Sequence, residues 1–159
     1  MIKEILTTGT LAASAAFLVP QASAQTFSPT GPFTLANVGS IVFSKDLTLT
    51  CGLTGSGSVS GGAASVSSIA VGGGAMCGVL FTGTPYVVSS SSLTSITLNG
   101  VVMTGLFGGT CAGSLTGDYD QSTGRITFLG ATIPSTSGGR PCRIAGRVQL
   151  SPIVTFTIP

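Results

Sequence analysis

Few side chains in this chain could do chemistry, and the most informative of them are its four cysteines. They are widely spaced, and the chain contains no Cys-x-x-Cys pair and no His, so a zinc site with its usual ligands cannot be assembled. Four cysteines in a small exported domain instead predict two disulfides, with three possible connectivities. We favour sequential pairing and a structural role, with the bonds Cys51–Cys77 and Cys111–Cys142.

An oxygen-rich cluster spans residues 118–124. Asp118 and Asp120 alternate as ligands do in a calcium loop, but the glycine comes one position late and Leu129 stands where a bidentate Glu would complete the site. The same two carboxylates could suggest a glycosidase pair, although no apolar pocket is evident that would raise the pKa of either. A polar hairpin turn explains these residues more simply, so we expect neither a metal nor another cofactor.

The sequence lacks the general base that a serine nucleophile would need. Serines are abundant, but a serine nucleophile needs a base, and the chain has no His. Lys45 is the one Lys beyond the N-terminal segment, and no Ser-x-x-Lys motif precedes it. The sequence therefore predicts a protein that is not an enzyme.

Arg140, Arg143 and Arg147 are the one basic cluster. Arg143 and Arg147 are four residues apart on a predicted strand, so their side chains project from the same face. We interpret the three as a solvated strand face. The functional alternative is contact with phosphate or carboxylate groups of an envelope lipid or an exopolysaccharide, which guanidinium groups suit. Because the formal net charge is only +2 and Lys is scarce, we expect no nucleic-acid partner.

These side chains follow an apparent secretion signal. Residues 1–24 combine a short polar start, an apolar stretch and Ala22-Ser23-Ala24, the small-residue pattern of a cleavage site. The apolar stretch is too short to cross a bilayer, which takes about 20 residues. We predict a signal peptide over residues 1–24 and a single disulfide-stabilised domain over residues 25–159. The expected location is secreted or cell-surface, with the periplasm as an alternative.

The elements that position these residues are predicted to be strands. Apolar residues recur with a period of two, and glycine and β-branched residues occur throughout, which disfavours helix. We predict an all-β fold, a single antiparallel β-sandwich or barrel-like domain of about 8–10 short strands. Asn99-Gly100 predicts a tight type I′ turn, residues 121–124 a second hairpin turn, and Ser151-Pro152 the break between a last pair of strands. The Gly/Ser run over residues 55–62 is either a loop or a small-residue strand.

Several segments together resemble one family of small secreted bacterial proteins. The runs are SIVFSKDLTLTC at residues 40–51, LNGV at 98–101 with GTCAG at 109–113, TGRITF at 123–128 with IP at 133–134, and CRIAG at 142–146 with SP at 151–152. They resemble the PraB-like alkane oxidation activator proteins. The resemblance implies an extracellular, non-catalytic protein that promotes growth on hydrocarbons and is associated with biofilm or cell-surface material. It brings no catalytic motif.

Two functions follow as hypotheses. A disulfide-locked domain with few charges would tolerate an oil–water interface and disperse alkane or bring cells to it, its partners being that interface or cell-surface and matrix components. The alternative is a structural subunit of an extracellular fibre, pilus-like or spore-coat-like, that self-associates by strand-edge pairing. The uncharged strand at residues 153–158 could serve as such an edge, although we interpret it as an ordinary strand within the domain.

Overall fold

The computed structural model describes residues 25–74, 77, 79–104 and 109–159, which form strands and the turns between them. The predicted all-β class is confirmed. The predicted signal peptide, residues 1–24, lies outside the described residues. Within the described ranges, no helix has the length and apolarity needed to cross a membrane. The strands are β1 (Thr26–Ser28), β2 (Gly31–Ser44), β3 (Thr48–Ser60), β4 (Ala63–Gly72), β5 (Leu80–Thr82), β6 (Tyr86–Ser89), β7 (Ser95–Thr104), β8 (Thr110–Asp120), β9 (Arg125–Ile133), β10 (Cys142–Ser151) and β11 (Thr155–Thr157).

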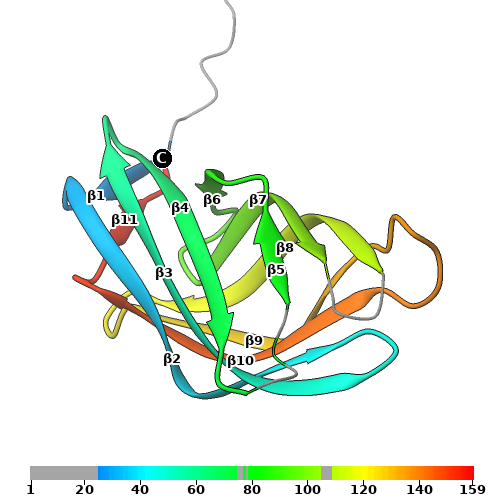
Figure 1. The fold of residues 1–159 in the computed structure, drawn as a ribbon. Helices are drawn as coiled ribbons and strands as arrows, with labels where there is room; N and C mark the ends of the chain where they lie inside the picture. Colours follow the sequence, from blue (N-terminus) through cyan, green and yellow to red (C-terminus); the bar gives the residue numbers. More distant parts are fainter. Residues whose placement is uncertain (1–24, 75–76, 78, 105–108) are drawn as a thin grey trace, which may run out of the picture.

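Eight of the strands close into an antiparallel barrel (Figure 1). Their order is β2, β3, β4, β6, β7, β8, β9 and β10, and β10 pairs with β2 to complete the ring. β5 pairs with β7 beyond the end of β6, so the two short strands share one edge of β7. Of the two architectures predicted, sandwich or barrel, the structure has the barrel.

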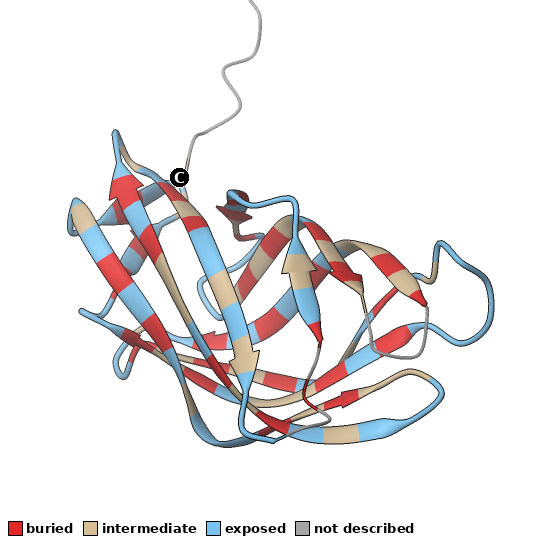
Figure 2. Ribbon diagram, in the orientation of Figure 1, coloured by how far each residue is buried: buried red, intermediate tan, exposed pale blue. Residues whose placement is uncertain are grey.

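The core fills the inside of this barrel because inward and outward residues alternate along each strand. Buried and exposed bands accordingly follow one another along the ribbon (Figure 2). In β3 the inward series continues through Gly55 and Gly57, in the middle of the Gly/Ser run. A Cβ atom on Gly57 would lie 2.3 Å from the Phe33 ring and 2.4 Å from the carbonyl oxygen of Ser65. The run at residues 55–62 is therefore mostly strand, and its glycines make room for large side chains of neighbouring strands.

The predicted turn at Asn99-Gly100 is wrong. β7 runs through both residues and pairs with β8 on either side, as Leu98 with Leu115 and Val101 with Gly113. Two residues of β7 thus oppose one residue of β8, which is a β-bulge, and Gly100 has the positive φ (72°) that such a bulge uses. The Asn99 side chain donates hydrogen bonds to β6, which fixes the bulge in the sheet.

The other two predicted turns have different outcomes. The hairpin around residues 121–124 is confirmed, because Asp120 pairs with Arg125 across it. The predicted pairing of the last two strands is wrong. β10 pairs with β2 and β9, whereas β11 pairs with β1. The reason is that residues 152–154 carry the chain across the barrel end, where the Phe27 and Phe156 rings pack with centroids 5.2 Å apart.

The pair β1 and β11 covers one end of the barrel, next to the β3–β4 hairpin. The backbone N–H of Phe27 donates to the carbonyl of Gly62 in that hairpin at 2.8 Å. Tyr119 of β8 stacks on Phe156, and its hydroxyl donates to the carbonyl of Val154. We call this the capped end. The opposite end, which holds the β2–β3 hairpin, we call the open end.

Candidate functional site

The interior of the barrel is filled by side chains. Two internal cavities have volumes of about 20 Å³ and about 10 Å³, and apolar side chains line both. One water molecule needs roughly 10–15 Å³ of such space. Neither of these two cavities has room for a hydrocarbon chain, which favours contact with one on the outer surface or at a barrel end.

The cysteines form two buried pairs near the open end. Cys51 of β3 pairs with Cys77 in the β4–β5 connection, and their sulfur atoms lie 2.16 Å apart. Cys111 of β8 pairs with Cys142 of β10, with sulfur atoms 2.00 Å apart. All four cysteines are buried, as their apolar strand neighbours suggest. These pairs at disulfide distance are the sequential ones. The first links β3 to the β4–β5 connection, and the second links the start of β8 to the start of β10.

The oxygen-rich cluster is the turn between β8 and β9. The Asp120 carboxylate accepts hydrogen bonds from the Ser122 backbone N–H at 2.9 Å and from the Thr123 hydroxyl at 2.8 Å. The Ser122 hydroxyl also donates to this carboxylate, at 2.6 Å. Hydrogen bonds from the Ser122 hydroxyl, the Thr123 hydroxyl and the Ser122 N–H hold the pKa of Asp120 below its usual value, although the side chain is exposed. The described ranges contain no group of three or more His, Cys, Asp or Glu side chains placed to hold a metal ion. Asp120 acts as the acceptor that shapes the turn.

Most of the charge lies on one side of the barrel, the outer face of β8, β9 and β10, which we call the charged wall. Thr127 of β9 pairs with Asp118 on one side and Arg147 on the other, so these residues form one row across three strands. Asp120, Arg125 and Gln149 form the next row. The charged residues on this wall are Asp118, Asp120, Arg125, Arg143 and Arg147, five of the eight that follow residue 24.

A broad open groove of about 580 Å³ crosses the charged wall, with Asp118, Asp120, Arg125 and Arg147 among its lining residues. These four charges cancel, so the groove has no net attraction for an anion. Of the three arginines singled out in the sequence, Arg147 lines the groove. The Arg143 guanidinium lies against Gly130 of β9, and Arg140 is exposed in the loop between β9 and β10. Contact of these arginines with an anionic surface stays a prediction.

The remaining barrel wall carries no charge. None of the strands β2, β3, β4, β6 and β7 contains a charged residue, and their outward positions are mainly Ser, Thr, Ala and Val. Thr54 lies near the middle of this surface, paired with Ala36 of β2 and Ala70 of β4. Val87 of β6 is 60% exposed. We call this outer face the uncharged wall. The strands of the barrel wall thus present one charged face and one uncharged face, and we call this arrangement the two-faced surface.

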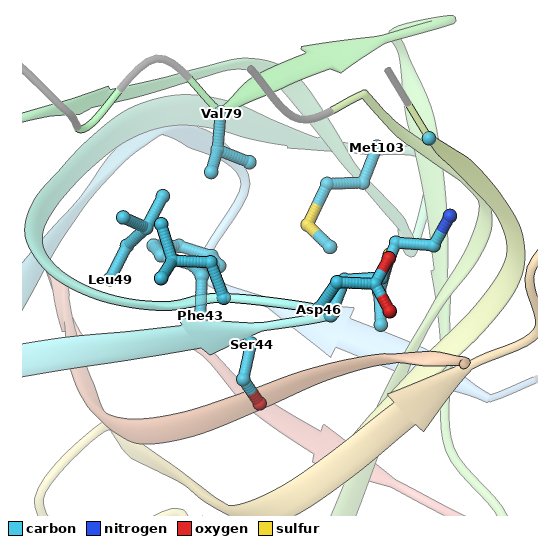
Figure 3. A pocket seen from close by; sticks show the side chains of 10 residues that line it. Phe43, Ser44, Asp46, Leu49, Val79 and Met103 are labelled. Carbon is cyan, nitrogen blue, oxygen red and sulfur yellow. The ribbon is translucent and has the colours of Figure 1, made fainter. Parts of the chain in front are cut away.

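The open end holds a third feature, a cavity of about 50 Å³ (Figure 3). It lies between the β2–β3 hairpin, Val79 before β5, Met103 of β7 and Gly109 before β8. Lys45 and Asp46, two of the three charges outside the charged wall, stand in the hairpin beside it.

Sequence reasoning missed both the two-faced surface and this cavity. In the sequence, the two aspartates and the arginines form separate clusters, because strand neighbours are not visible without the pairing order. One signal was available: no charged residue occurs between Asp46 and Asp118. For the cavity there was no comparable signal, since its walls come from five separated segments, the four named above and Cys142 of β10.

A protein-family model described as alkane oxidation protein activator PraA/PraB-like matches residues 1–158 of the chain. No curated protein and no solved structure matches this chain. The match covers nearly the whole sequence, and the four segments that resemble this family lie on β2 and β3, β7 and β8, β9, and β10. The chain therefore belongs to the PraA/PraB-like family of alkane oxidation protein activators.

Proposed function

We propose that the protein works outside the cytoplasm as a non-catalytic surface protein that promotes contact with alkanes by adsorbing at the hydrocarbon–water interface. The observation that carries this proposal is the separation of charge between the two walls. Placing the uncharged wall against oil desolvates Ser, Thr, Ala and Val side chains but no ion, while the charged wall stays in water. The filled interior favours contact at this outer surface over enclosure of a hydrocarbon.

The location outside the cytoplasm is supported by the two buried cysteine pairs at disulfide distance. Disulfides persist in oxidising compartments and are rare in the cytosol. Association with biofilm or cell-surface material is part of the same proposal, because a surface-active protein released by a cell also coats that cell.

The interface proposal is tested by measuring hexadecane–water interfacial tension with a pendant drop. The purified protein should lower the tension. Thr54→Lys, which puts an ammonium in the middle of the uncharged wall, should weaken the effect, because desolvating a charge costs several kcal/mol. Thr132→Lys on the charged wall is the matched control, since Thr132 is also an exposed threonine within a strand.

Either of two results would end the proposal: an interfacial tension that the protein leaves unchanged, or equal losses in Thr54→Lys and Thr132→Lys. At the level of the cell, deletion of the gene should slow growth on a long alkane and leave growth on a soluble carbon source unchanged. Unchanged growth on both, with altered adhesion, would favour a matrix role.

The alternative function, a fibre subunit joined by edge pairing, is favoured by one observation. β4 pairs with β3 along its length but with β6 only at residues 64–66. Residues 67–72 of β4 therefore pair with a neighbouring strand on one side only, the side of β3. No charge or proline protects this edge. The segment at residues 153–158, the alternative edge, contains β11, which pairs with β1 and buries Phe156, in line with its interpretation as a strand within the domain. A fibre subunit should run as SDS-resistant or high-mass species, whereas a surface-active monomer should not.

A further inference from the structure

We propose that the open end of the barrel is a binding site for a short, straight-chain alkyl carboxylate. The alkyl chain enters the cavity beside the β2–β3 hairpin, and the carboxylate lies at its mouth, where it accepts a hydrogen bond from the Lys45 ammonium. This site is separate from the uncharged wall and does not depend on adsorption at an interface.

The first support is the apolar character of the cavity. Phe43, Leu49, Val79 and Met103 gather around one space, while the Ser44 side chain points away from it (Figure 3). Phe43, Val79 and Met103 are each at most 5% exposed, so the walls belong to the packed core and are held in place. Walls of this kind bind an alkyl chain by removing it from water. They offer no hydrogen bond to a polar group of a ligand.

The second support is the size of the cavity. Its volume of about 50 Å³ is more than twice that of the internal cavity of about 20 Å³. At roughly 10–15 Å³ for each water-sized group, it holds about four such groups. A methylene is of similar size, so the cavity fits a chain of about four carbons, as in pentanoate. A longer chain would have to leave the cavity or displace core side chains.

The third support is the position of Lys45. Its Nζ donates hydrogen bonds to the Ser137 hydroxyl at 3.1 Å and to the Gly138 carbonyl at 3.4 Å. The side chain crosses Gly109, where a Cβ atom would lie only 1.9 Å from Nζ, so the glycine makes this course possible. Both acceptors are neutral, and an ammonium has three N–H donors. The ammonium is thus held beside an apolar cavity with a donor and a positive charge available to an anion.

Asp46 is the charged group that opposes this ligand. It follows Lys45 in the hairpin, lines the same cavity and is exposed. Its carboxylate repels an anion at the mouth, although solvent screens the repulsion. Removing its charge should therefore strengthen binding, whereas removing the charge of Lys45 should weaken it. A built site differs from general attraction in that removing a positive charge elsewhere on the barrel, at Arg147, should leave binding unchanged.

The test is a titration followed by NMR of protein labelled with ¹³C at the methionine methyl groups. The Met103 signal, assigned by its loss in Met103→Leu, reports directly on the cavity. Pentanoate should shift it to saturation. Pentanamide, which is neutral and of the same shape, and butylammonium, which has the same alkyl chain, should each bind at least fivefold more weakly. From propanoate to pentanoate, affinity should rise roughly fourfold for each added methylene, and it should level off beyond pentanoate, whose chain fills the cavity.

The variants separate the site from nonspecific attraction. Lys45→Gln should lower the affinity for pentanoate at least fivefold, Asp46→Asn should raise it, and Arg147→Gln on the charged wall should leave it unchanged. Equal binding of pentanoate and pentanamide by the unaltered protein would overturn the proposal without any variant. So would an unmoved Met103 signal, or equal losses in Lys45→Gln and Arg147→Gln. None of these results bears on interfacial tension, so this site and the interfacial role fail separately.

Discussion

At the scale of single residues, glycine decides how closely the strands pack. Gly57 of β3 lies against Phe33 and Gly117 of β8 lies against Phe128, where a Cβ atom would come within 2.8 Å of the ring. The large side chain of one strand thus occupies the space that its neighbour leaves empty. In the sequence, such glycines suggest a loop, because the residue that fills the space beside each of them is far away in the chain.

Gly57→Ala should therefore destabilise the protein, by about 1–3 kcal/mol for an overpacked core site. The added methyl group meets both a ring and a backbone carbonyl, so the strand itself has to move. Gly72→Ala is the matched control, because Gly72 also lies in a strand, without a positive φ and with open space around it. Urea denaturation of the two variants checks the difference. Equal midpoints would contradict this account of Gly57.

At the scale of elements, the alternation of apolar residues predicted strands well and their partners poorly. Period-two patterns mark inward and outward faces, which is a local property. Asn99-Gly100 shows the limit of predicting structure from a local pattern, because the same two residues suit both a type I′ turn and a bulge. Only the continued pairing of β7 with β8 decides between the two. The pairing of β11 with β1 was equally invisible, since these strands lie at opposite ends of the described chain.

The two disulfides join segments that are not paired with each other in the sheet, β3 with the β4–β5 connection and β8 with β10. Their sequence separations are similar, 26 and 31 residues. Replacing either pair with alanine, as Cys51→Ala with Cys77→Ala or Cys111→Ala with Cys142→Ala, should cost about 3–4 kcal/mol from the entropy of the unfolded chain. Urea denaturation of the two double variants measures this loss. A denaturation midpoint that did not move would show that the bond does not restrict the unfolded chain.

At the scale of the whole molecule, the class of fold was predictable and the surface was not. Few charges, abundant glycine and alternating apolar residues led to an all-β domain, and the structure is an all-β barrel. The two-faced surface depends on which strands are neighbours, so it appears only once β8, β9 and β10 are placed side by side. The same holds for the open end, where Lys45 reaches Ser137 across 92 positions in the sequence.

The stability of the whole molecule should fall in alkaline solution. Burial raises the pKa of Tyr119 from 10.0 to about 12 and also raises that of Tyr86. Because the folded state favours the protonated tyrosines, their contribution is complete below pH 10 and is lost as the pH rises further, for Tyr119 as it passes about pH 12.

These two tyrosines are the only ones in the chain, and it has no Trp, so tyrosinate absorbance reports on them without interference. The folded protein should show no titration centred at pH 10, whereas the protein unfolded in guanidinium chloride should titrate there. A folded protein that titrated at pH 10 would contradict the burial of both side chains.

The pairing of Thr26 with Thr157 brings the beginning and the end of the described domain to the same place, the capped end. An anchor, an affinity tag or a second domain attached at either end of residues 25–159 would therefore hold the barrel by one pole. The opposite pole, with Lys45 and its cavity, would face away from the attachment, and both walls would stay accessible along the sides. The protein can thus be displayed on a bead or a cell in one orientation from either terminus, without covering any of the three surfaces.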